Sequence, residues 1–246
     1  MYRMQKVYLI GAGPGDPDLL TVKAHRLLQQ AEVVLHDELF GTEILDLLPL
    51  TAILYNVGKM CGDHQNQEER QNRINALIQK EYLEGKSVIR LKTGDSLIFG
   101  RGIEEARFLK ANNINYELIP GITAGLAAAN IFSIPLTERL KNSAVLFCTG
   151  HTLELGVKQF LDLVNFLKAG NPVVVYMGYH NLEKITATLI ENGISAETGI
   201  CVASKVSHAE QDHVDGNLIS IHSRLKEKPL PSPTVIILGT YVESLL

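Results

Sequence analysis

The segment SVIRLKTGDSLIFGRG spans residues 87–102 and joins a short apolar strand to a glycine-rich turn and the start of a helix. The apolar residues within 88–91 predict a buried strand that ends at the turn formed by residues 93–96. In open α/β sheets, ligands bind at the carboxyl ends of the strands, where this turn would lie. Gly94 allows close approach of the backbone to a ligand, and the Asp95 carboxylate suits ribose hydroxyls or an ammonium group. By local pattern alone, an ordinary strand, polar turn and helix start is an equal alternative.

The composition is typical of a globular protein without nucleic-acid or membrane partners. The 246 residues are 46% hydrophobic and 20% charged, enough for one large domain or two modest ones. The net charge of −4 provides no basic field for nucleic acid. Cys61, Cys148 and Cys201 are widely spaced, which predicts free thiols in a reducing compartment. No signal peptide and no apolar run of about 20 residues are apparent, so we expect a cytoplasmic protein.

Three further predicted strands of the first half are each followed by glycine or a charged side chain. Residues 7–10 precede the loop GAGPGD at 11–16, residues 31–35 precede Asp37, and residues 53–57 precede Lys59. Such residues at several strand ends indicate a binding cleft rather than chance. The glycine spacing disfavours a nicotinamide dinucleotide, because an aspartate in the sixth place of the loop would repel the pyrophosphate. A lone aspartate such as Asp37 is more often a turn former or helix cap.

The spacing of Cys61 and His64 matches half of a zinc site. No second pair of ligands accompanies it, so we predict no metal. His64 is better interpreted as a loop histidine that meets an anionic ligand.

Strands and helices alternate along the whole chain, which predicts an α/β fold. The Pro-Gly pair at 120–121 predicts a hinge between two α/β domains, residues 1–120 and 121–246. Helices are expected in the first half at 19–31, 68–84 and 104–111, with a strand at 116–119. In the second half, strands are expected at 144–148, 172–177, 200–203 and 234–238, and helices at 126–131, 155–167, 181–192 and 218–225. Met177 ends the predicted strand at 172–177, and a methionine at such a position is more often a core residue than a ligand contact.

Eight motifs, in order, closely resemble those of the tetrapyrrole methylase family. They occupy residues 11–17, 34–37, 57–59, 90–102, 120–124, 134–137, 149–151 and 176–178. The resemblance covers nearly the whole chain and thins after Met177. It implies two α/β domains with the active cleft between them, a homodimer, and S-adenosylmethionine as methyl donor, released as S-adenosylhomocysteine. The motifs are most similar to those of members that methylate uroporphyrinogen III at carbons 2 and 7, giving precorrin-2 for sirohaem or cobalamin.

The resemblance also implies roles for individual residues. Asp37 would accept a proton and Lys59 would donate one. Arg101, Arg139 and His64 would bind the carboxylates of the tetrapyrrole. Lys59, Arg101 and Arg139 would position it through charge-assisted hydrogen bonds. The donor would be held by Pro14, Thr93, Gly94, Asp95, Ile98, Thr123, Ala124 and Met177.

This chain departs from the family pattern at a few of these positions. Thr93 replaces the usual glycine, Glu138 replaces a histidine in the Pro-Leu-Thr-His-Arg motif, and Val206 stands where a glycine is expected. These departures leave open another precorrin methyltransferase as the alternative activity. Methylation of RNA or of diphthamide is disfavoured because the chain lacks a basic surface. A non-catalytic nucleotide-binding module is the alternative from another class.

Overall fold

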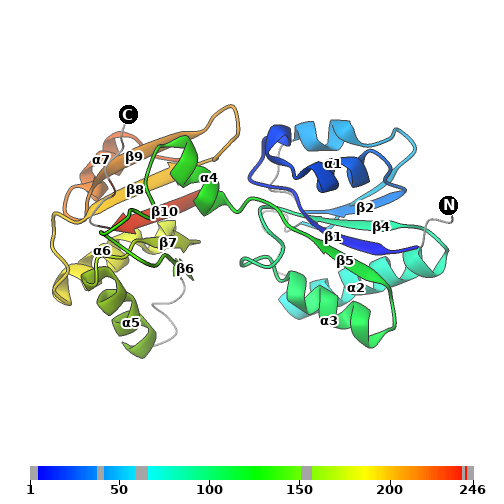
Figure 1. The fold of residues 1–246 in the computed structure, drawn as a ribbon, viewed down its shortest axis with the longest axis horizontal. Helices are drawn as coiled ribbons and strands as arrows, with labels where there is room; N and C mark the ends of the chain where they lie inside the picture. The colour runs from blue at the N-terminus through cyan, green and yellow to red at the C-terminus, as the bar shows by residue number, and fades with distance from the viewer. Residues whose placement is uncertain (1–4, 38–41, 59–65, 151–156, 240–241, 243–246) are drawn as a thin grey trace. The chain divides into compact units, whose positions relative to one another are not determined.

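The computed structural model describes residues 5–37, 42–58, 66–150, 157–239 and 242. The chain separates into two compact units, Met1–Thr123 and Ala124–Leu246. Each unit has its own five-stranded sheet with helices packed against it (Figure 1). The fold class is therefore α/β in both halves, as predicted.

The sheet of the first unit is parallel throughout and has the strand order β3-β2-β4-β1-β5. Its strands are β1 (Val7–Gly11), β2 (Val33–His36), β3 (Ile53–Asn56), β4 (Val88–Lys92) and β5 (Tyr116–Ile119). Because all five strands run the same way, their carboxyl ends meet at one edge. The strands β1 and β4 are neighbours in the sheet. The chain continues from β1 to β2, toward one edge of the sheet, and from β4 to β5, toward the other edge. This reversal is the switch point at which open α/β sheets bind ligands.

Helices cover both faces of this sheet (Figure 1). The helix α1 (Val22–Leu28) packs on one face, while α2 (Gln67–Leu83) and α3 (Gly102–Ala111) pack on the other. Two short 3-10 helices, η1 (Pro17–Leu19) and η2 (Thr42–Leu47), complete the described helices of this unit. Parallel sheets covered on both faces need strands that are apolar on both sides, and β1 is buried at every position.

The strand β4 is buried throughout but not apolar throughout. Ile89 and Leu91 join the core beneath α1, whereas Val88 joins the core beneath α2 and α3. Since side chains alternate along a strand, Arg90 and Lys92 also face α2 and α3. Two cations are thus buried at the carboxyl end of the central strand.

The first predicted helix, residues 19–31, is two helices. Asp16 caps η1, with its side chain accepting from the Asp18 amide over 2.8 Å and Pro17 at the first position. Thr21 caps α1 by accepting from the Ala24 amide over 3.2 Å. Asp16 and Thr21 thus each cap their own helix.

The sheet of the second unit is mixed, with the order β6-β7-β10-β8-β9. Its strands are β6 (Leu146–Thr149), β7 (Val173–Tyr176), β8 (Gly199–Ser204), β9 (Asp212–Asn217) and β10 (Thr234–Gly239). Only β6 and β7 pair in parallel. The sequence analysis missed β9, an edge strand of sequence DHVDGN in which only Val214 is buried.

Helices of the second unit bury one large apolar cluster against the sheet. They are α5 (Val157–Lys168), α6 (Leu182–Glu191), α7 (Ile221–Glu227) and the 3-10 helix η4 (Tyr179–Asn181). The helix α4 (Ala124–Ile131) contacts β7 and β10 but contributes no residue to this cluster. The amphipathic helix α6 contributes Leu182, Ile185 and Leu189 at helical spacing. Among the described residues, no helix is both long enough and apolar enough to cross a bilayer.

Candidate functional site

Three glycines bring the loops after β1, β4 and β5 into backbone contact at the carboxyl edge of the first sheet. A Cβ atom on Gly121 would lie 2.2 Å from the Gly94 carbonyl oxygen, and one on Gly11 would lie 2.6 Å from the same atom. Gly13 and Gly94 also exchange two backbone hydrogen bonds, of 3.1 and 2.8 Å. No side chain fits among these loops, because neighbouring backbone already occupies the space that a Cβ atom would need.

Asp95 joins two of these loops. Its Oδ1 accepts from the Leu97 amide over 2.8 Å, and its Oδ2 accepts from the Gly121 amide over 3.1 Å. Each carboxylate oxygen can accept more than one hydrogen bond, so a ligand donor can still be bound. The sequence analysis predicted a ligand contact at Asp95 and did not foresee its structural role.

The other predicted donor residues of the first unit lie on or near the same edge. Pro14 is buried in the first glycine loop, and Thr123 is also buried. Thr93 is half-buried, and its hydroxyl oxygen is enclosed without a hydrogen-bond partner among the described residues. Ile98 is 39% exposed and follows the Asp95 turn, with its amide donating to the Asp95 carbonyl over 3.3 Å. The sheet therefore brings these four residues to the loops after β1, β4 and β5.

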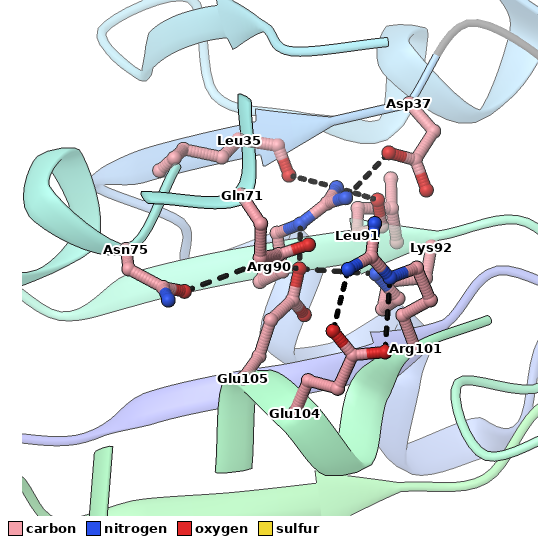
Figure 2. Close-up of polar contacts among 10 residues, drawn as sticks. All are labelled: Leu35, Asp37, Gln71, Asn75, Arg90, Leu91, Lys92, Arg101, Glu104 and Glu105. Atoms are coloured by element: carbon pink, nitrogen blue, oxygen red, sulfur yellow. Dashed lines mark hydrogen bonds and ion pairs between the residues drawn. The ribbon is translucent and has the colours of Figure 1, made fainter. Parts of the chain in front are cut away.

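A cluster of buried charges lies beside this edge, on the face covered by α2 and α3 (Figure 2). Arg90 forms an ion pair with Asp37, directly after β2, and donates from Nε to Glu105 Oε1 over 3.1 Å. Lys92 Nζ lies 3.1 Å from the same Glu105 oxygen. The Arg90, Lys92 and Glu105 side chains are each at most 4% exposed, whereas Asp37 is 29% exposed. Asp37 is thus the member of the cluster that solvent or a ligand can reach.

Burial acts on the two cations differently. Although burial disfavours the charge of Arg90, the Asp37 and Glu105 carboxylates raise the pKa of its guanidinium above the ordinary value. Burial lowers the pKa of Lys92, and the neighbouring Arg90 charge acts in the same direction. Removing one partner from such a cluster leaves an unpaired buried charge, at a cost of about 3–5 kcal/mol.

The predicted substrate-binding residues differ in whether their side chains are already paired. Arg101 holds a left-handed conformation (φ 58°) and makes a two-pronged ion pair with Glu104, over 3.0 and 2.6 Å. This hydrogen-bonded contact with Glu104 raises the pKa of Arg101. Arg139, in the second unit, is exposed and forms no ion pair with any described residue. The predicted proton donor Lys59 and the predicted loop histidine His64 lie outside the described residues, as does Cys61.

Met177 follows β7 in the second unit and holds a left-handed conformation, with φ 54°. Its side chain is 53% exposed. A non-glycine residue with this backbone is strained, and such residues concentrate at binding sites. The exposure favours a ligand contact over the core role suggested by composition. Ala124, the other predicted donor residue of this unit, opens α4.

Two residues of the second unit that differ from the family pattern, Glu138 and Val206, are both described by the structure. Glu138 forms an ion pair with Lys141 over 2.7 Å, which offsets its negative charge locally. Val206 is 5% exposed and belongs to the buried apolar residues of the unit.

Sequence reasoning missed Arg90, Lys92 and Glu105 as members of the site. A signal was present, because two cations alternate with apolar residues in a strand predicted to be buried. Buried cations require partners, and the acidic residues at the start of the next helix were the nearest candidates. The carboxylates that would supply those partners could not be chosen without the packing of α3 on the sheet.

The fold and this edge define a two-unit α/β protein whose first sheet has the kind of switch point at which open α/β sheets bind ligands. The family model for Tetrapyrrole (Corrin/Porphyrin) Methylases matches residues 6–221. The chain therefore belongs to the tetrapyrrole methylase family.

Two curated relatives differ in how much of their length this chain spans. The S-adenosyl-L-methionine-dependent uroporphyrinogen III methyltransferase of Methanosarcina barkeri is 40% identical over 237 residues, which cover 96% of this chain and 92% of the relative. The siroheme synthase of Psychrobacter arcticus is 44% identical over 239 residues, covering 97% of this chain but only 43% of that protein. The chain thus spans less than half the length of the siroheme synthase that it matches.

Two solved structures are similar over nearly the whole chain. The X-ray structure of cobalt precorrin-4 methyltransferase, a cobalamin biosynthetic enzyme, has a TM-score of 0.84 at 26% identity and covers 97% of this chain and 96% of its own. The uroporphyrin-III C-methyltransferase of Thermus thermophilus, complexed with S-adenosylhomocysteine, has a TM-score of 0.77 at 32% identity, with 96% and 98% covered.

Proposed function

We propose that this chain is an S-adenosylmethionine-dependent C-methyltransferase that methylates uroporphyrinogen III at carbons 2 and 7 to give precorrin-2. The observation that carries the proposal is the near full-length similarity to the Methanosarcina barkeri uroporphyrinogen III methyltransferase. The product would feed sirohaem or cobalamin synthesis. The proposal includes a cytoplasmic homodimer, as the family resemblance implies.

The residues at the strand ends fit the donor. The loops after β1, β4 and β5 pack closely at this switch point, which is where open α/β sheets bind ligands, and the enclosed Thr93 hydroxyl has no hydrogen-bond partner among the described residues. We assign donor binding to Pro14, Thr93, Gly94, Asp95, Ile98 and Thr123 in the first unit, and to Ala124 and Met177 in the second. When bound, the donor supplies an electrophilic sulfonium methyl group.

The reaction mainly requires alignment of the pyrrole carbon with the methyl group, together with an acceptor for the proton that leaves. An electron-rich pyrrole carbon attacks the methyl group, so charge disappears in the transition state and positioning contributes most of the rate. A proton then leaves the macrocycle, and the partly exposed Asp37 carboxylate is assigned as its acceptor. Lys59 is assigned as the proton donor.

The substrate carries several carboxylates, and the proposal assigns their binding to Arg101, Arg139 and His64. Arg139 is exposed and available for a charge-assisted hydrogen bond. Arg101 would exchange its exposed pairing with Glu104 for a substrate carboxylate, at small cost because exposed ion pairs contribute about 0–1 kcal/mol.

A second candidate is methylation of a later precorrin. The TM-score of 0.84 to cobalt precorrin-4 methyltransferase favours it, although the sequence identity is lower than to the Thermus thermophilus enzyme. The two candidates share the donor and differ in the macrocycle.

The test is a methyl-transfer assay with methyl-labelled donor and either uroporphyrinogen III or a precorrin-4 substrate. We expect label to appear in the tetrapyrrole with uroporphyrinogen III. Label transferred only to the later precorrin would replace the first proposal by the second. Donor binding without transfer to either macrocycle would favour a non-catalytic module.

A further inference from the structure

Glu105 lies at the centre of the buried charged cluster, although the family resemblance assigns it no role. Its Oε1 accepts from Arg90 Nε and Lys92 Nζ, each over 3.1 Å, and from Gln71 Nε2 over 3.2 Å (Figure 2). The side chain is fully buried, and Oε2 has no hydrogen-bond partner among the described residues. One carboxylate oxygen therefore holds two cations, which come from the same strand.

Arg90 connects Glu105 with Asp37. Its guanidinium donates from Nε to Glu105, from Nη1 to the Leu91 carbonyl over 2.9 Å and to the Leu35 carbonyl over 3.4 Å, and from Nη2 to Asp37. A guanidinium is planar, with its donors in a fixed fork, so contacts at Nε and Nη1 set the direction of Nη2. The orientation of the Asp37 carboxylate thus depends on contacts made deeper in the core.

We propose that Glu105 and Arg90 are positioning residues for methyl transfer: Glu105 fixes the Arg90 guanidinium, and the guanidinium holds Asp37 where it accepts the proton of the substrate. The inference rests on the proposed function, because Asp37 has its role only there. With Lys92 the cluster contains two cations and two carboxylates, so its charges balance. Neither Glu105 nor Arg90 touches the reacting atoms; both act through Asp37.

Glu81 provides a matched control for Glu105. It is 1% exposed, lies in α2, and accepts from Lys86 Nζ over 2.5 Å and from the Tyr55 hydroxyl over 2.9 Å. Lys86 comes two residues before β4 begins, so this pair lies toward the amino end of the strand, away from Asp37. Both glutamates are buried and paired with cations, although Lys86 is 30% exposed whereas Arg90 and Lys92 are buried. The two pairs lie toward opposite ends of β4.

The first measurement compares Arg90→Lys, Glu105→Gln and Glu81→Gln for kcat and KM with uroporphyrinogen III and for Kd with S-adenosylhomocysteine. Arg90→Lys keeps the charge but loses the fork, so kcat should fall by about tenfold or more, as expected when a reacting group is misplaced. The Kd for S-adenosylhomocysteine should stay within about twofold. Glu105→Gln should also lower kcat. Glu81→Gln should lower the urea concentration at the unfolding midpoint and leave kcat unchanged. Equal losses of kcat in both glutamine variants, or parallel losses of kcat and donor affinity in Arg90→Lys, would overturn the inference.

The second measurement is a double-mutant cycle between Arg90→Lys and Asp37→Asn, followed by single-turnover transfer of labelled methyl. Asp37→Asn keeps an oxygen that accepts from Arg90, so the variant should fold even where Glu105→Gln does not. If Arg90 acts through Asp37, adding Arg90→Lys to Asp37→Asn causes no further loss of rate. Multiplicative losses in an active parent would overturn this inference alone. A parent inactive on uroporphyrinogen III would overturn the proposed function and this inference with it.

Discussion

The backbone amide of Gly121 donates a hydrogen bond to Oδ2 of Asp95 over 3.1 Å and so ties the loop after β5 to the loop after β4. The same carboxylate accepts from the Leu97 amide through its other oxygen, over 2.8 Å. One side chain therefore fixes the shape of two loops at the switch point of the first sheet. Loss of this carboxylate should affect the binding edge as a whole rather than a single ligand contact.

Asp95→Ala should abolish binding of S-adenosylhomocysteine, because both backbone hydrogen bonds and any ligand contact are lost together. Titration calorimetry provides the measurement. Asp162→Ala, at an exposed position in α5, serves as the matched control and should leave the Kd unchanged. An unaltered Kd in Asp95→Ala would refute the role given to this carboxylate.

Gly121→Ala should lower the free energy of unfolding by about 3 kcal/mol and weaken donor binding, since its Cβ would lie 2.2 Å from the Gly94 carbonyl oxygen. Gly85→Ala is the contrasting control, with backbone strain and no clash: Gly85 has φ +89°, unlike Gly121, and no atom lies within 4 Å of the position that its Cβ would take. That variant should lose about 1–2 kcal/mol and bind the donor normally. Urea unfolding with calorimetry measures both effects. Equal destabilisation of the two variants, with intact donor binding, would contradict the close approach of the loops.

Met177→Gly should raise stability while weakening donor binding. Relief of the left-handed conformation contributes about 1–2 kcal/mol, and the added flexibility of glycine in the unfolded chain offsets about half of it. Ser133→Gly, also at a left-handed position (φ 53°), should gain similar stability without any change in donor affinity. If Met177→Gly binds S-adenosylhomocysteine as tightly as the parent protein, the methionine is no donor contact.

Glu81 should make stability depend on pH in the acid range. The hydrogen bond from Lys86 lowers the pKa of this buried carboxyl below its ordinary value of 4.5, against the opposing effect of burial. A carboxyl with a depressed pKa contributes stability that is fully present above the ordinary value and is lost as pH falls through the lowered one. Urea unfolding should therefore show Glu81→Gln to be less stable than the parent at pH 7, with the difference shrinking below pH 4.5. A difference that is constant across this range would argue against the ion pair as its source.

Much of the first unit could be predicted from sequence because its strands are short apolar runs followed by glycine, aspartate or lysine. The predicted strand at 116–119 coincides with β5. The strand predicted within 88–91 corresponds to β4, which ends one residue later, at Lys92. The glycine loops were also predicted, since a turn at a strand end in an α/β pattern has few alternatives. What could not be foreseen was that Asp95 would bind the backbone of Gly121, a contact between residues 26 positions apart.

The elements that were missed are those whose pattern depends on tertiary neighbours. The strand β9 has a polar sequence because it lies at a sheet edge and buries one residue, Val214. Local pattern treats such a segment as a loop. Glu105 falls at the start of the helix predicted at 104–111, and its burial follows only from the packing of α3 over Arg90 and Lys92.

The mass spectrum of the tetrapyrrole formed from uroporphyrinogen III and S-adenosylmethionine tests the central claim most directly. The account predicts a product that carries two additional methyl groups, with a singly methylated species appearing first, and a much slower but measurable formation of this product by the Asp37→Asn variant. Recovery of unmodified uroporphyrinogen III after incubation with a protein that binds the donor would contradict it.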